Sequence, residues 1–277
     1  MKISDLPIKN VIATNDSLIV DNNGTSTQRI KATDLAFAQF AYLPQTRNQI
    51  IRGKSLGSAF TEWHKTQIRT GIFNDLFLGD YWEYGGVKWR IVDFNYYNSS
   101  ENNAKNHVIV LPDQNLSRTA ATSAENSTKN YCDSLMYNAA ASLKSRFAAL
   151  FGDSYIMGHF DSFANNYDGS STYPYYSDEA LARGGIFTTL PDEIMLFGTH
   201  IMASMQAGRN ANSHITGRQF AYFKCGAPMP TPTEDFWLRD KSWYNYFVCW
   251  RSYRVNQDIW SNQHGLRPFA AITGEPN

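Results

Sequence analysis

The N-terminal part of the chain alternates apolar and polar positions in two short runs. Residues 17–20 and 27–30 have the pattern of strands, and the Asn-Asn-Gly segment at 22–24 accepts positive φ at little cost, so a β-hairpin is predicted. Asp34 is placed to cap a short helix that is broken at Pro44. Because an isolated hairpin is marginally stable in water, we expect this one to pack against a partner.

Past residue 50 the pattern changes between helical and extended runs. Residues 61–70 predict a helix that ends at Gly71, and the runs flanking Gly85 and Gly86 predict a second hairpin. The segment His107–Pro112 is almost entirely apolar, which predicts a buried strand.

The clearest helical pattern covers residues 134–150. Leu135, Ala139, Leu143 and Phe147 repeat there at four-residue spacing. The C-terminal half of the chain alternates short polar loops with short ordered pieces, without an internal repeat or a long linker. We therefore predict an α+β fold, with a small N-terminal hairpin segment at residues 1–40 and one large domain at residues 41–277.

The composition narrows the choice of partners. Lys and Arg together number 25, as do Asp and Glu, so the net charge is zero and nothing electrostatic favours nucleic acid. The first residues lack the apolar stretch of a secretory signal, and no run approaches the roughly 18 apolar residues that cross a bilayer. The 3 cysteines are widely spaced and predict neither a disulfide framework nor a zinc site. We expect a chain made in the cytoplasm, without membrane insertion.

No arrangement of catalytic or metal-binding residues stands out. The 6 histidines never form HxH or HExxH, and the motifs of serine hydrolases and phosphate loops are absent. Asp192 and Glu193 are neighbours whose side chains point in different directions, which makes a poor acid–base pair. Asp192 or Asp161 is expected to act as a local cap instead. We predict a protein that is not an enzyme and that needs no cofactor or metal.

One segment near the C-terminus has an unusual composition. Residues 243–264 hold seven aromatic side chains and no Lys or Glu, whereas aromatic residues make up 14% of the whole chain. Tyr, Trp and Arg interleaved with Asn, Gln and Ser are typical of interface hot spots and antibody-like binding surfaces. The alternative is an ordinary hairpin whose aromatic side chains are in the core.

Alternation distinguishes these two interpretations. In an extended run, positions 248, 250, 252 and 254 share one face, and the odd positions from 247 to 255 share the other. Each face mixes apolar side chains with polar ones, so both cannot be core, and the pattern is lost between 255 and 264. We favour a binding surface. The segment GLRPFAAI that follows predicts a buried anchoring strand, with Gly265 turning the chain and Arg267 in a local hydrogen-bond network.

Several blocks between Arg52 and Ile272 resemble a known class. The frame WLRD…GLRP around the aromatic segment and the block GDYW…GGVKWRI at 79–91 are the most specific. They resemble phage structural proteins of the C-type-lectin-like class, including variable proteins diversified by diversity-generating retroelements, such as the major tropism determinant. The segment ISDLP…KATDL at 3–35 is similar, less specifically, to N-terminal segments of phage tail and head-fibre proteins.

The resemblance implies a C-type-lectin-like domain and a non-enzymatic virion protein that determines tropism by binding a bacterial surface protein or glycan. It implies a homotrimer on the tail or capsid, with residues 1–40 attached to other virion proteins. By position it implies a set of ligand-contacting residues in the variable segment: Trp243, Tyr244, Tyr246, Arg251, Tyr253, Asn256, Asp258, Trp260, Asn262 and His264. The alternative is a capsid or baseplate decoration or assembly protein. A polysaccharide hydrolase would need a carboxylate pair in a groove, and the sequence has no motif for one.

Overall fold

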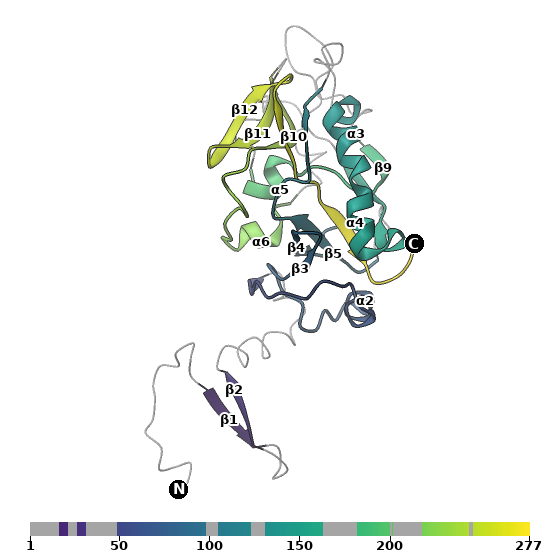
Figure 1. Ribbon diagram of the computed structural model, residues 1–277, viewed down its shortest axis with the longest axis vertical. Coiled ribbons are helices and arrows are strands. Elements are labelled where there is room, and N and C mark those ends of the chain that lie inside the picture. The colour runs from purple at the N-terminus through teal and green to yellow at the C-terminus, as the bar shows by residue number, and fades with distance from the viewer. Residues whose placement is uncertain are drawn as a thin grey trace. The chain divides into compact units, whose positions relative to one another are not determined.

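The computed structural model describes residues 17–21, 27–31, 49–97, 105–122, 131–162, 182–199, 201, 218–243 and 246–277. The chain divides into two compact units, Met1–Arg47 and Asn48–Asn277 (Figure 1). In the first unit, β1 (Ser17–Asp21) pairs antiparallel with β2 (Thr27–Lys31), with Ser17 opposite Lys31. This confirms the predicted N-terminal hairpin. Its turn and the helix predicted after Asp34 lie outside the described residues.

The second unit is mixed α/β and consists mostly of sheets. Two sheets of five strands carry it, and we name them after a member of each. The β5 sheet has the order β3 (Tyr81–Tyr84), β4 (Val87–Phe94), β5 (His107–Pro112), β14 (Ala270–Thr273) and β7 (Ile156–Met157). The β11 sheet has the order β12 (Arg254–Ile259), β11 (Tyr246–Arg251), β10 (Phe236–Trp243), β13 (Gln263–Leu266) and β6 (Ser117–Ala120). A separate pair joins β8 (His159–Ser162) and β9 (Ala182–Ile186).

Short helices accompany the sheets. They are α2 (Glu62–Arg69), α3 (Leu135–Ser142), α4 (Lys144–Phe151), α5 (Glu193–Phe197) and α6 (Ala221–Lys224), with 3-10 turns at Tyr131–Asp133 and Asp153–Tyr155. Thr61 caps α2, because its side chain accepts from the backbone N–H of His64 while the His64 ring accepts from the backbone N–H of Thr61. The predictions of this helix, of the hairpin at Gly85 and Gly86 and of the strand His107–Pro112 are confirmed.

The single helix predicted over 134–150 is wrong, because the chain forms two helices that meet at Leu143. The hydroxyl of Ser142 donates to the carbonyl of Ala139 at 2.7 Å, and the hydroxyl of Thr188 donates to the carbonyl of Ala140 at 2.9 Å. Hydroxyls that bond to helix carbonyls in this way bend or interrupt a helix. The buried face also differs from the predicted one, since Leu135 is 44% exposed.

The β11 sheet is covered on both faces. Along β10, Phe236 and Leu238 belong to the main hydrophobic core, whereas Trp237 between them belongs to a second, smaller cluster. Side chains alternate between faces along a strand, so the two clusters lie on opposite faces of the sheet. The smaller cluster also contains Phe247 and Leu266.

Strand β11 corrects the argument that both of its faces cannot be core. Phe247, Val248 and Cys249 are all fully buried, so both faces are core in the first half of the strand. Residues 251–254 that follow are exposed. The change from buried to exposed therefore runs along the strand and not across it. The aromatic segment has a buried base and an exposed end, which we call the tip (residues 251–254).

Candidate ligand-binding surface

The tip is a two-residue turn between β11 and β12. Arg251 and Arg254 are the last paired residues, and Ser252 and Tyr253 between them have φ of 53° and 64°. Two central residues with positive φ define the type I′ hairpin turn, which normally uses Asn and Gly. A bulky residue such as Tyr is an outlier in this conformation, at a cost of roughly 1 kcal/mol or more. Tyr253 is nevertheless there, and it is 64% exposed.

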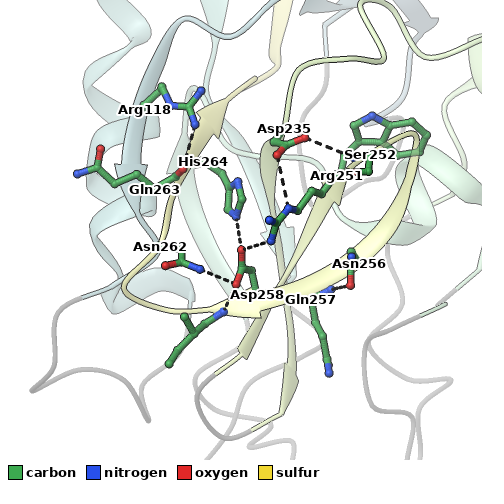
Figure 2. A network of polar contacts seen from close by, with 12 residues as sticks. Arg118, Asp235, Arg251, Ser252, Asn256, Gln257, Asp258, Asn262, Gln263 and His264 are labelled. Atoms are coloured by element: carbon green, nitrogen blue, oxygen red, sulfur yellow. Dashed lines mark hydrogen bonds and ion pairs between the residues drawn. The ribbon is translucent and has the colours of Figure 1, made fainter.

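Asp258 in β12 holds the segment together beneath the tip (Figure 2). Its carboxylate accepts from Nη1 of Arg251 at 2.9 Å and from Nδ2 of Asn262 at 2.7 Å. It also lies 2.8 Å from Nε2 of His264 and accepts from the backbone N–H of Ile259. Burial raises the pKa of Asp258, but these hydrogen bonds outweigh it and hold the pKa below its usual range. The carboxylate thereby ties the tip to β12 and β13.

Asp235, just before β10, fastens the tip from the other side. Its carboxylate lies 3.7 Å from Nε of Arg251 and accepts weakly from the backbone N–H of Ser252 at 3.4 Å. Figure 2 shows Arg251 lying between Asp235 and Asp258. One residue away, the indole of Trp250 donates to the carbonyl of Pro232 at 2.9 Å and stacks on Phe197. The turn therefore stands on a base with fixed side chains.

The predicted contact residues separate into three groups by exposure and position, with Trp260 apart from them. Arg251, Tyr253 and Asn262 are exposed, and Asn256 is half-buried. The second group comprises Asp258 and His264, which are only 9% and 5% exposed. These two have little surface to offer a ligand, and we reassign them to positioning the residues above them.

Trp260 is half-buried as well, but its ring packs against the smaller cluster below the sheet. Its carbonyl accepts from the backbone N–H of Ala121 at 2.9 Å. Trp260 thus anchors the turn between β12 and β13.

The third group lies at the end of β11 away from the tip, where the backbones of Trp243 and Tyr246 pair. Tyr244 lies outside the described residues, and the structure does not describe the side chains of Trp243 and Tyr246.

Four exposed residues of the tip and β12 were missing from the predicted set: Ser252, Arg254, Gln257 and Ile259. Arg254 is the most informative, because it stands directly opposite Arg251 in the hairpin. Its place could have been found by treating Ser252 and Tyr253 as a two-residue turn. That signal was weak, because neither is a typical residue for such a turn.

The frame around the segment is buried, as predicted. Trp237 is fully buried, and its indole donates to the carbonyl of Thr119 at 2.9 Å. Arg267 is 1% exposed and donates to the carbonyls of Pro230 and Thr231. Gly265 does not turn the chain as expected. It lies within β13, where a Cβ atom would come 2.0 Å from the side chain of Asn115.

A buried ion cluster lies near the start of α5. Arg239, 4% exposed, pairs with both Asp161 and Asp192. Burial lowers the pKa of Arg239, but the two carboxylates outweigh it and hold the pKa well above its usual value. Asp192 also caps α5, as predicted, by accepting from the backbone N–H of Met195 at 2.7 Å. Asp161 is a strand residue and not a cap, which corrects that alternative.

Among the described residues, no group of three His, Cys, Asp or Glu side chains is placed to hold a metal ion. No helix within the described ranges is both long and apolar enough to cross a membrane. No family model, curated protein or solved structure matches this chain.

Proposed function

We propose that the second unit is a non-enzymatic recognition domain that binds a bacterial surface ligand through the tip and the adjoining face of β12. The observation that carries this proposal is the exposed Tyr253 in a left-handed conformation. Backbone strain at an exposed aromatic side chain lowers stability, and such strain tends to concentrate at functional sites. Asn-Gly would build the same turn without strain, so the choice of Tyr is better explained by contact with a ligand.

The base of the tip supports the same proposal. A binding site gains affinity when its side chains are held in place before the ligand arrives. Arg251 is held by Asp235 and Asp258, and Trp250 by Pro232 and Phe197. The segment thus combines fixed side chains with an exposed aromatic ring.

The resemblance of the WLRD…GLRP frame to phage proteins supports a proposal for the fold and the class of protein. On that basis we propose a C-type-lectin-like fold and a phage virion protein that determines tropism, in which the frame is constant and the residues between vary. The buried Trp237 and Arg267 suit a constant frame, since substitution of either would disturb the core. The exposed tip suits variation, since its side chains face solvent.

Adsorption of the purified full-length protein to the bacterium that the parent phage infects tests this proposal. Tyr253→Ala should abolish binding, because an exposed aromatic anchor contributes about 2 kcal/mol or more. Tyr84→Ala is the matched control, because Tyr84 is 40% exposed beside the turn of another hairpin. If Tyr253→Ala adsorbs like the wild type, the tip is not the binding surface.

Sequencing the phage DNA separately tests the proposal that residues 243–264 are diversified. A near-copy of codons 243–264 with differences at adenines, lying beside the gene, would support a diversified receptor-binding protein. An invariant segment without such a copy would contradict diversification and favour the decoration or assembly role.

A further inference from the structure

Two arginines face each other at the tip. Arg251 and Arg254 are directly opposite in the antiparallel pair of β11 and β12. Residues in this relation project from the same face of a sheet, with Cβ atoms about 5 Å apart, and like charges there destabilise a hairpin. Asp258 and Asp235 account for the presence of Arg251, but the stability of the fold does not account for Arg254 beside it.

Two of the three guanidinium nitrogens of Arg251 contact carboxylates, and the third does not. Nη1 donates to Asp258 at 2.9 Å, and Nε lies 3.7 Å from Asp235. Nη2 makes no hydrogen bond with any residue that the structure describes, and the side chain is 45% exposed. A guanidinium fixed in this way presents its remaining donors in a defined direction, which suits a planar anion such as a carboxylate.

Arg254 carries charge that nothing in the described part of the chain balances. Its side chain is exposed and makes no hydrogen bond or ion pair with the described residues. Two carboxylates contact this end of the hairpin. Asp258 already binds Arg251, Asn262 and His264, and Asp235 contacts Arg251 and the backbone N–H of Ser252. An anion bound between Arg251 and Arg254 would relieve the repulsion between them and use the donors that both leave open.

We infer that the ligand carries an acidic sugar, whose carboxylate lies between Arg251 and Arg254 and whose ring packs on Tyr253; this rests on the function proposed above. A sugar fits this surface better than a protein does. A protein interface buries about 800 Å² on each side around an apolar centre. Among the described residues at the tip, the large exposed apolar side chain is Tyr253.

A further neighbour suits the hydroxyl groups of such a sugar. Asn256 is half-buried on β12, two positions from Arg254, so its side chain projects from the same face as the two arginines. Side-chain amides both donate and accept hydrogen bonds, and so match hydroxyl groups. The tip and the adjoining residue of β12 therefore offer a ring platform, two cations and an amide on one face of the hairpin.

Titration of the isotope-labelled full-length protein with sodium glucuronate, followed by NMR of the arginine Nε–H groups and the tyrosine rings, tests the inference. We expect saturable shifts at Arg251, Arg254 and Tyr253. Glucose should leave all three unchanged, and acetate should move the arginines but not Tyr253. A glutamate-containing tripeptide is the protein-like probe and should bind more weakly than glucuronate.

Variants complete the test. Arg254→Ala should weaken glucuronate binding about 10-fold or more, as expected for the loss of charge-assisted hydrogen bonds. Arg146→Ala, which removes an equal charge from the exposed face of α4, should leave the affinity unchanged. No saturable shift with glucuronate, equal shifts with glucose, stronger binding of the tripeptide, or an equal loss in Arg146→Ala would each overturn the inference. If glucuronate fails while Tyr253→Ala still abolishes adsorption, the proposed function stands and only the acidic sugar is rejected.

Discussion

Nε2 of His264 lies 2.8 Å from Oδ2 of Asp258, and both side chains are buried beneath the exposed tip. The two residues are six positions apart and lie on strands that do not pair with each other, β12 and β13. The same carboxylate holds Arg251 and Asn262. Asp258 is therefore the residue through which the buried frame fixes the exposed part of the segment.

Asp258→Asn should destabilise the protein by about 1–3 kcal/mol at pH 7, because it weakens the charge-assisted hydrogen bonds that the partly buried carboxylate accepts from Arg251, Asn262 and His264. The pKa of Asp258 is lowered by folding, so its contribution is present above its unfolded pKa of about 3.9 and is lost as pH falls through the folded value. Urea denaturation at pH 7 and pH 3 should show the difference between wild type and variant shrinking at the lower pH. A difference that is equal at both values would show that the charge of Asp258 does not matter.

The double substitution Ser252→Asn and Tyr253→Gly should stabilise the fold by about 1 kcal/mol, because it places the preferred residues in a type I′ turn. The same protein should lose adsorption. Urea denaturation and cell binding, measured together, check the two effects. A variant that is less stable than the wild type would show that Tyr253 supports the fold, which would remove the main argument for a ligand.

Trp237→Ala should destabilise the protein by about 3–5 kcal/mol, because it opens a cavity under the β11 sheet and leaves the carbonyl of Thr119 without its donor. Trp237→Phe should cost less, and thermal melting of both variants compares them. A stable Trp237→Ala protein that has lost only adsorption would place Trp237 in the binding site.

Burial lowers the pKa of His107 to about 4, and the hydrogen bonds agree with a neutral ring. Nε2 accepts from the backbone N–H of Tyr97 at 3.1 Å, and Nδ1 lies 2.7 Å from the carbonyl of Lys105. The unfolded histidine has a pKa of about 6.5, so the contribution of His107 to stability is complete above that value and declines as pH falls towards 4. NMR of the ring should show no titration between pH 7 and pH 5. A titration near pH 6.5 would contradict the buried, neutral state.

Sequence reasoning succeeded where the signal is local. The turn at Gly85 and Gly86 and the apolar run at His107–Pro112 need no knowledge of distant residues. It failed where a distant residue decides the outcome. The break at Leu143 involves Thr188, which lies 48 positions from the Ala140 carbonyl to which it bonds.

The site shows the same limit. The sequence pointed to the segment 243–264, but composition cannot show that the exposure changes along β11 and not across it. Asp258 and His264 look like surface residues until their pairing is known. Arg254 gains its significance only from the register that sets it opposite Arg251.

The last prediction concerns the N-terminal unit. Its described part is one hairpin of two strands, β1 and β2, which is too small to be stable alone. Edges of such strands also invite pairing with other chains. Light scattering should therefore find the full-length protein as an oligomer, with a trimer expected from the resemblance, and a chain that begins at Asn48 as a folded monomer. A weak site repeated in an oligomer gains roughly 10²–10⁴-fold in avidity, so the shortened chain should also adsorb more weakly while keeping its affinity for glucuronate. A monomeric full-length protein, or a shortened chain that still enters virions, would show that residues 1–40 are not the assembly and attachment segment.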